Sequence, residues 1–287
     1  MNDKDLNKVP LNKSEKQLFG KGKIAWEKSQ DEVWNELQHK LSQKPETTVV
    51  SFRHRVLQWS MAAVFLLLVG LLGLVSSYTK EIECLPGEHK LVQLPGGSTV
   101  ELNADSRLVY YPLKWKLERK LKLEGEAYFN VSKGRKFYII SEKGTTSVFG
   151  TSFNIYAREN EYRVTCLTGK VIVTSNEEQK VELLPNNHAE LEKGKLVVKK
   201  MFEPEKAIGW KNNQFFFANR PLREVIDEIE RQYAVTIQLA PELNNRNFGS
   251  NFSKKHSVEE VLDYVCKPMN LKFVKQSENV YLVVEKS

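Results

Sequence analysis

The sequence predicts a multi-domain, membrane-anchored protein with a short α-helix, one transmembrane helix, an all-β domain and a C-terminal α+β domain. Three observations lead to this fold class. Residues 56–79 form a run of 24 residues without a formal charge, residues 88–200 contain short β-type runs, and residues 205–287 contain a strand-helix-strand pattern twice. The expected segments are therefore 1–55, 56–79, 80–204 and 205–287.

The uncharged run has the length and composition of a spanning helix, which needs about 20 mostly apolar residues. Trp59 and Tyr78 lie 19 residues apart, or about 28 Å at 1.5 Å per residue, as expected for aromatic residues at two bilayer faces. The nearest basic residues are Lys40, Lys44, Arg53 and Arg55 before the run and Lys80 and Lys90 after it. This asymmetry predicts the N-terminus inside and the C-terminus outside. A cleaved signal peptide is the alternative, but 55 mostly polar residues precede the run.

The charge of the chain gives little support for nucleic-acid binding. The 287 residues carry a formal net charge of +7, of which residues 1–55 contribute 11 Lys/Arg and 8 Asp/Glu. Because the excess is spread thinly and forms no basic block, we expect no direct contact with nucleic acid. The three cysteines, Cys84, Cys166 and Cys266, all follow the apolar run, so one disulfide is possible with one thiol left over.

Upstream of the apolar run, residues 24–41 predict an amphipathic helix. The apolar residues on one helical face are Trp26, Val33, Trp34, Leu37 and Leu41. A segment of about 55 residues is too small to bury two Trp by itself, so this face is predicted to fit a groove on a partner protein. The alternative is a juxtamembrane helix that lies at the membrane surface or associates with itself.

Between residues 88 and 200, short runs of strand-forming residues alternate with Gly, Pro and Asn. This spacing is typical of an all-β unit, here expected to be antiparallel and sandwich- or solenoid-like. Residues 120–123 and 127–131 are predicted as two strands separated near Gly125. Glu124 and Glu126 flank this glycine, and we expect both carboxylates at a solvated strand end.

After residue 205 the pattern becomes mixed and repeats. A strand at 213–217, a helix from Pro221 and a strand at 235–239 form the first unit. The second unit follows without gaps at an offset of 36 residues, so that Phe216 corresponds to Phe252. A capping-box sequence marks its helix, and a final strand at 280–284 closes the domain. The sequence therefore predicts a small α+β domain with duplicated units.

Enzyme chemistry is hard to find in this sequence. The five His are isolated, no Gly-rich phosphate loop occurs, and Cys166 lies in an alternating strand typical of a core. We therefore expect no metal, no cofactor and no turnover enzyme. One peptide bond stands out, Gly150-Thr151 between two β runs, because a Thr hydroxyl can attack the preceding carbonyl in a strained turn. A plain turn is the ordinary alternative.

Four blocks resemble the FecR family of transmembrane anti-sigma regulators across about residues 80–200. They are LPGGSTVELNADSRL at 94–108, LEGEAYFNV at 123–131, FGTSFNI at 149–155 and LTGKV at 167–171. The first block departs from the family at Gly96, where Asp is usual. The C-terminal unit, with Trp210, residues 215–217, Pro221 and Leu239, resembles the short secretin/TonB-type signalling domain found in many members.

This resemblance implies a regulator of the inner membrane with a cytoplasmic N-terminus and a periplasmic C-terminus. Its tail would bind an extracytoplasmic-function (ECF) sigma factor, and the residues expected to contact it are Trp26, Val33, Trp34, Leu37 and Leu41. A TonB-dependent outer-membrane transducer would contact unspecified residues within 205–287. Some members cleave themselves at the bond matching Gly150-Thr151 by an N-to-O acyl shift. The competing classes are a membrane-anchored envelope glycan-binding protein and an assembly subunit.

Overall fold

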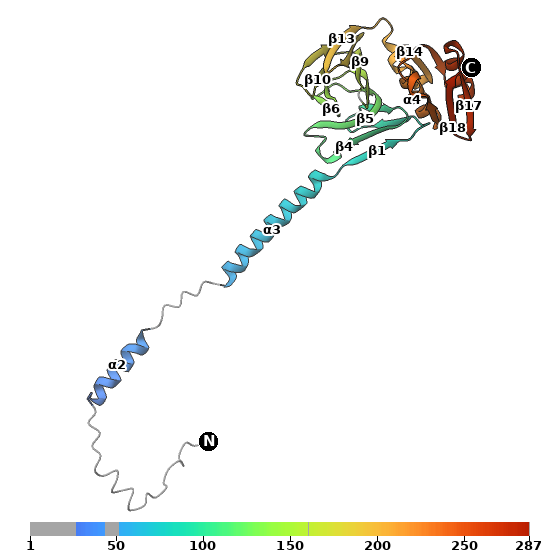
Figure 1. Ribbon diagram of the computed structural model, residues 1–287. Helices are drawn as coiled ribbons and strands as arrows, with labels where there is room; N and C mark the ends of the chain where they lie inside the picture. The colour runs from blue at the N-terminus through green and yellow to red at the C-terminus, as the bar shows by residue number, and fades with distance from the viewer. Residues whose placement is uncertain (1–26, 44–51, 160, 287) are drawn as a thin grey trace, which may run out of the picture. The chain divides into compact units, whose positions relative to one another are not determined.

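The computed structural model describes residues 27–43, 52–159 and 161–286 (Figure 1). The chain divides into two compact units, Met1–Leu66 and Leu67–Ser287, with the boundary inside helix α3 (Phe52–Ser77). The second unit contains a large β domain and a C-terminal α+β domain, each with its own apolar core. The predicted helices and the α+β character of the C-terminal region are confirmed.

Helix α2 (Gln30–Ser42) begins six residues later than the predicted start at residue 24. The physical reason is a capping box at Ser29: its hydroxyl accepts a hydrogen bond from the Glu32 N–H at 3.2 Å, and the Glu32 carboxylate accepts one from the Ser29 N–H at 2.9 Å. No residue of α2 is buried. Trp26, the first of the predicted partner contacts, lies outside the described residues.

Helix α3 contains the predicted apolar run. Its segment Val56–Leu74 has a mean hydropathy of 2.1 with none of it buried, so this one helix is long and apolar enough to cross a membrane. Strand β1 (Lys80–Cys84) follows after only Tyr78 and Thr79. Strand β1 was not predicted because its run of alternating charged residues lacks the usual strand composition.

Thirteen strands, β1 to β13, form one sheet in the β domain. They are β1 (Lys80–Cys84), β2 (Lys90–Gln93), β3 (Thr99–Leu102), β4 (Ser106–Tyr110), β5 (Arg119–Asn130), β6 (Phe137–Ser141), β7 (Gly144–Val148), β8 (Ser152–Arg158), β9 (Glu161–Thr168), β10 (Val171–Ser175), β11 (Lys180–Leu183), β12 (Asn187–Glu192) and β13 (Lys195–Lys200), with the 3-10 helix η1 (Pro112–Lys114). The two ends of the strand order, β11 and β13, approach each other. The side chain of Gln179, next to β11, exchanges two hydrogen bonds with the Leu196 backbone of β13, at 2.7 and 3.3 Å. The domain is therefore a nearly closed barrel, not the predicted sandwich or solenoid.

Strand β5 organises this sheet. Its first half pairs with β4 and β6, and its second half pairs with β3 and β8. The two predicted strands at 120–123 and 127–131 are thus one strand, which bends at Gly125, where φ is 98° and a Cβ would lie 2.7 Å from the Ser106 Cα. The pairing is antiparallel as predicted, apart from the parallel pair β5 and β6.

The C-terminal domain contains the predicted duplication. Its elements are η2 (Pro204–Asn212), β14 (Gln214–Pro221), α4 (Leu222–Tyr233), β15 (Thr236–Leu239), η3 (Pro241–Leu243), β16 (Asn247–Ser253), α5 (Val258–Cys266), η4 (Lys267–Met269), β17 (Leu271–Ser277) and β18 (Val280–Glu285). The first strands of the two units, β14 and β16, pair with each other. The second strands, β15 and β17, lie on either side of β18, so the two units share both small sheets.

The cysteines Cys84, Cys166 and Cys266 are all free and buried. The first two lie in the core of the β domain and the third lies in the core of the C-terminal domain. The predicted core role of Cys166 therefore holds, and the disulfide that the sequence left possible does not form.

Candidate functional site

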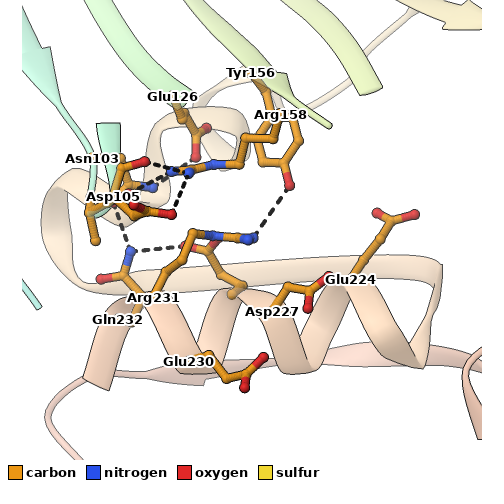
Figure 2. Close-up of polar contacts among 12 residues, drawn as sticks. Asn103, Asp105, Glu126, Tyr156, Arg158, Glu224, Asp227, Glu230, Arg231 and Gln232 are labelled. Atoms are coloured by element: carbon orange, nitrogen blue, oxygen red, sulfur yellow. Dashed lines mark hydrogen bonds and ion pairs between the residues drawn. The ribbon is translucent and has the colours of Figure 1, made fainter. Parts of the chain in front are cut away.

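Helix α4 meets the β domain through a cluster of buried and half-buried polar side chains, which we call the polar joint (Figure 2). The apolar face of α4 packs into the core of the C-terminal domain, while an adjoining face carries Glu228, Arg231 and Gln232. Their spacing of three and four residues places them on one helical face. The members of the joint are Asn103, Glu126, Tyr156 and Arg158 from the β domain and Glu228, Arg231 and Gln232 from α4.

Gln232 lies at the centre of the joint and is fully buried. Its amide nitrogen donates to Asn103 Oδ1 at 2.7 Å and to Glu228 Oε1 at 2.9 Å, and its amide oxygen lies 3.1 Å from His89 Nε2. Asn103 in turn donates to Glu126 Oε2 at 2.8 Å. A continuous chain of hydrogen bonds therefore connects β5 to α4, and each link fixes the orientation of the next.

The joint buries two carboxylates, and their pKa values move in opposite directions. Burial and the negative charge of Glu228 raise the pKa of Glu126. Burial also raises the pKa of Glu228, but the charges of Arg231 and Arg158 outweigh it and the net pKa is lowered. Arg231 Nη2 lies 2.9 Å from the Glu228 carboxylate and 3.4 Å from the Tyr156 hydroxyl. Glu228 is thus held ionised although its side chain is buried.

The expected solvated position of Glu126 is wrong, because its side chain turns inward across the bend of β5. It is only 7% exposed and accepts hydrogen bonds from Asn103 and, at 2.7 Å, from the Asn154 amide. Glu124, on the other side of Gly125, is exposed as expected. The strand bend at Gly125 therefore separates a buried carboxylate from an exposed one.

Ion pairs surround the joint and connect the same two domains. Arg220 lies 2.8 Å from Glu190, Arg163 lies 3.4 Å from Glu224, and Lys211 lies 3.0 Å from Glu101. Burial opposes ionisation of Glu190, but the hydrogen bond and charge of Arg220 lower its pKa to about 2. The packing of the two domains against each other therefore depends on ion pairs as well as on complementary shape.

A cavity of about 520 Å³ lies beside the joint, between β8, β9 and β12 on one side and η2, β14 and α4 on the other. Burial lowers the pKa of His188 in its wall to about 4, so this imidazole is neutral near pH 7. Within the described ranges, no group of three or more His, Cys, Asp or Glu is arranged to hold a metal ion. The arrangement is suited to positioning two domains.

The Gly150-Thr151 bond lies outside the joint, in the turn between β7 and β8. Thr151 is 5% exposed, and its hydroxyl has no hydrogen-bond partner among the described residues. A Cβ at Gly150 would lie 2.8 Å from the Lys133 Cα, and a Cβ at Gly169 would lie 3.0 Å from the Gly150 carbonyl oxygen. Two glycines are therefore needed for the close packing around this bond.

The predicted partner contacts on α2 form an exposed stripe. Val33, Trp34, Leu37 and Leu41 are 37%, 63%, 47% and 78% exposed. They lie in the first unit, whereas Gly150, Thr151 and the joint lie in the second unit. The joint residues of α4 were not predicted because their spacing is that of an ordinary polar helix face. One sequence feature pointed toward the joint: Asn103 lies in the block at 94–108, which resembles the FecR family.

Comparisons with known proteins agree with this architecture. Residues 80–172 match the FecR protein family, and residues 214–283 match the family of the FecR C-terminal region. Two crystal structures of candidate anti-sigma factors from Parabacteroides distasonis are similar. One is 29% identical, covers 73% of this chain and 100% of its own, with a TM-score of 0.68; the other is 28% identical, covers 72% and 100%, with a TM-score of 0.65. No curated protein matches the sequence.

Proposed function

Because the chain belongs to the FecR family, which is generally non-enzymatic, we propose that it is a transmembrane anti-sigma factor. A TonB-dependent outer-membrane transducer would contact the C-terminal domain, within residues 205–287. The signal would cross the polar joint and the β domain and reach an ECF sigma factor through α3. One observation carries the proposal: an unburied apolar helix lies in sequence between a helix with an exposed apolar stripe and the FecR-matched domains.

The proposed topology is a single pass through the inner membrane with the N-terminus in the cytoplasm. The basic residues before the apolar helix support this orientation, since Lys and Arg are retained on the cytoplasmic side. The proposed segments are the cytoplasmic tail at residues 1–55, the span at 56–79, the periplasmic β domain at 80–204 and the signalling domain at 205–287.

The stripe on α2 is the proposed sigma-factor contact, together with Trp26 upstream. No residue of the stripe is buried within the described part of the chain, so its burial would contribute binding energy when a partner covers it. Aromatic side chains such as Trp34 are typical of residues that dominate binding energy. The opposite face, which includes Asn35, is polar and serves as a control surface.

The test uses the solubilised full chain and individually purified ECF sigma factors from the same cell. We expect the chain to retain one of them, the double variant Trp34→Ala and Leu37→Ala to lose it, and Asn35→Ala to keep it. Retention of none by the unchanged chain, or equal retention by all three proteins, would contradict the proposal.

The polar joint is the proposed relay between the signalling domain and the rest of the chain. Strand β8 supports this role, because it begins at Ser152 next to the Gly150-Thr151 bond and ends with Tyr156 and Arg158 in the joint. A shift of α4 against the joint would therefore act on one end of a strand whose other end adjoins that bond.

Self-cleavage at Gly150-Thr151 is the proposed covalent step. The Thr151 hydroxyl would attack the Gly150 carbonyl carbon, the C–N bond would break, and the Thr151 amine would take the hydroxyl proton. Water would then hydrolyse the resulting ester. The Thr151 hydroxyl has no hydrogen-bond partner among the described residues, and this, with the close packing around the bond, supports the step. We expect two fragments from the full chain and from Thr151→Ser, and one intact band from Thr151→Ala; an intact unchanged chain would contradict it.

A further inference from the structure

One end of the β domain gathers the loops nearest to the start of β1, and we call it the basal end. The strand register defines it through consecutive paired residues. These pairs are Lys80 with Tyr110, Tyr110 with Leu121, Arg119 with Phe137, Phe137 with Val148, Val148 with Val171, and Val171 with Leu183. The loops beyond these residues, 111–118, 131–136, 149–151, 169–170 and 184–186, therefore lie at the same end of the sheet as Lys80.

Charge separates the basal end from the opposite end of the barrel. The basal loops contain six basic side chains and one acidic side chain: Lys114, Lys116, Lys133, Arg135, Lys136 and Lys170 against Glu118. The loops at the opposite end contain six acidic and two basic side chains: Glu88, Asp105, Glu142, Glu159, Glu177 and Glu178 against Lys143 and Lys193. The barrel is thus positively charged at the end where the chain enters it.

Large apolar side chains are exposed on the same basal loops. Leu117 is 81% exposed, Phe149 is 56% exposed, and Leu113 and Leu184 are at least half exposed. Single exposed apolar residues are ordinary, but several on adjoining loops among basic residues indicate an interaction surface. Leu next to Lys is the composition that binds the interface of a membrane.

The loop that holds Leu113 and Leu117 is fixed in place. Trp115 between them is buried and packs edge-on against Tyr110 and Phe137, with ring centroids 5.5 Å away in both cases. Arg135 from the adjoining loop donates to the Leu117 carbonyl at 3.3 Å. Because this anchor turns Trp115 inward, it presents both leucines to the outside instead of leaving them to collapse onto the core.

The connection to α3 limits how far the basal end can be from the membrane. Only Tyr78 and Thr79 separate the end of α3 at Ser77 from Lys80. Three residue steps reach at most about 11 Å. If α3 spans the membrane, as the proposed function requires, the basal loops start within the headgroup layer or just above it.

We propose that the basal end is a docking surface for a bilayer that contains anionic phospholipids. Leu113, Leu117 and Phe149 enter the interfacial layer, and the lysines and Arg135 lie against the headgroup phosphates. This contact holds the barrel upright on its short link and directs the polar joint away from the membrane. The inference rests on the proposed span of α3.

The experiment uses the full chain in lipid nanodiscs with the substitution Leu117→Cys and an environment-sensitive fluorophore. The native cysteines are at most 2% exposed, so the label reacts at the introduced site. We expect a blue-shifted emission and strong quenching by spin-labelled headgroups. The matched control is Val274→Cys on β17. Val274 is 48% exposed but belongs to the C-terminal domain and to none of the basal loops, so it should show neither effect.

Charge is tested by Lys114→Glu with Lys116→Glu in the labelled protein. Quenching should fall in discs that contain phosphatidylglycerol and stay unchanged in discs of phosphatidylcholine alone, while Glu177→Lys should leave both unchanged. Equal quenching at positions 117 and 274 in a chain that floats with vesicles would overturn the docking surface and leave the span intact. A chain that does not float with vesicles would overturn the span and the docking surface together.

Discussion

The core of the β domain and the polar joint both contain fully buried side chains but are built from opposite chemistry. Phe129 in the core and Gln232 in the joint are both fully buried. Phe129 stacks on Phe153 with ring centroids 5.1 Å apart, whereas Gln232 connects carboxylates and amides by directed hydrogen bonds. The core tolerates little change of shape, while the joint is sensitive to a change of charge, which suits the relay proposed for it.

The largest effect is expected in the core. Phe129→Ala removes an aromatic side chain that packs against Phe137 as well as Phe153, and it should lower the free energy of unfolding by about 3–5 kcal/mol. Urea unfolding of the solubilised full chain, followed by circular dichroism, measures this loss. Phe202→Ala, where the ring is 92% exposed, is the matched control and should change stability by less than about 0.5 kcal/mol. Similar losses in both variants would break the comparison.

A smaller but qualitatively different effect is expected in the joint. Glu228→Gln keeps the shape of the side chain but removes the ionic contact with Arg231, and it should cost about 1.5–3 kcal/mol. Because the joint connects two separate cores, we also expect one unfolding transition to split into two. Differential scanning calorimetry would show the split, and Glu278→Gln on the exposed surface should leave a single transition. A uniform shift of one transition would count against a separable joint.

The joint and the ion pairs that surround it should also respond to pH where the core does not. Glu190 has a folded pKa of about 2, below its ordinary value of 4.5, so its contribution is complete above about pH 4.5 and is lost as the pH falls toward 2. Glu228, with a lowered pKa, acts in the same direction, whereas Glu126, with a raised pKa, acts oppositely. Glu190→Gln should therefore show a shallower fall in melting temperature between pH 5 and 3 than the unchanged chain, and parallel curves would contradict this assignment.

The smallest effect in the series is expected on the surface. Arg107 of β4 contacts Glu81 of β1, and both side chains are 43% exposed. Solvent and salt screen such a pair, so Arg107→Ala should move the melting temperature less than any joint variant. The remaining shift should disappear in high salt. A shift as large as that of Glu228→Gln would show that exposed pairs matter as much as buried ones here.

Local patterns predicted the regions of the fold that local physics decides. The apolar run of α3 is long and uncharged, and the helices α4 and α5 of the duplicated units have a strong helical periodicity, so their sequence contains enough information. Gly125 was predicted to separate two strands because glycine usually ends them, but cross-strand pairing on both sides carries β5 through the bend. The apolar spacing that starts at Ile24 predicts an earlier start for α2 than the structure has, because the capping box at Ser29 and not the apolar pattern sets the first turn.

The joint could not be predicted in the same way because its partners are far apart in the sequence. Asn103 and Gln232, which share a hydrogen bond, are separated by 129 positions. Glu126 has the composition of an exposed strand residue, but the bend of β5 turns its side chain inward to Asn103 and Asn154. The exposed stripe of α2 stays a prediction of partner contact, since periodicity places the residues on one face and does not identify what covers them.

The link between α3 and the joint has a mechanical consequence. β1 pairs with β4 over five residues, and three positions after it the Gly87 N–H donates to the Arg231 carbonyl of α4 at 2.7 Å. Ten residue steps, from Ser77 to Gly87, thus connect the end of α3 to a backbone contact with α4. A pull between the two acts lengthwise on β1, which loads all five pairs in shear instead of opening them one at a time. Strand β1 is therefore expected to transmit a displacement along its length before its pairing with β4 breaks.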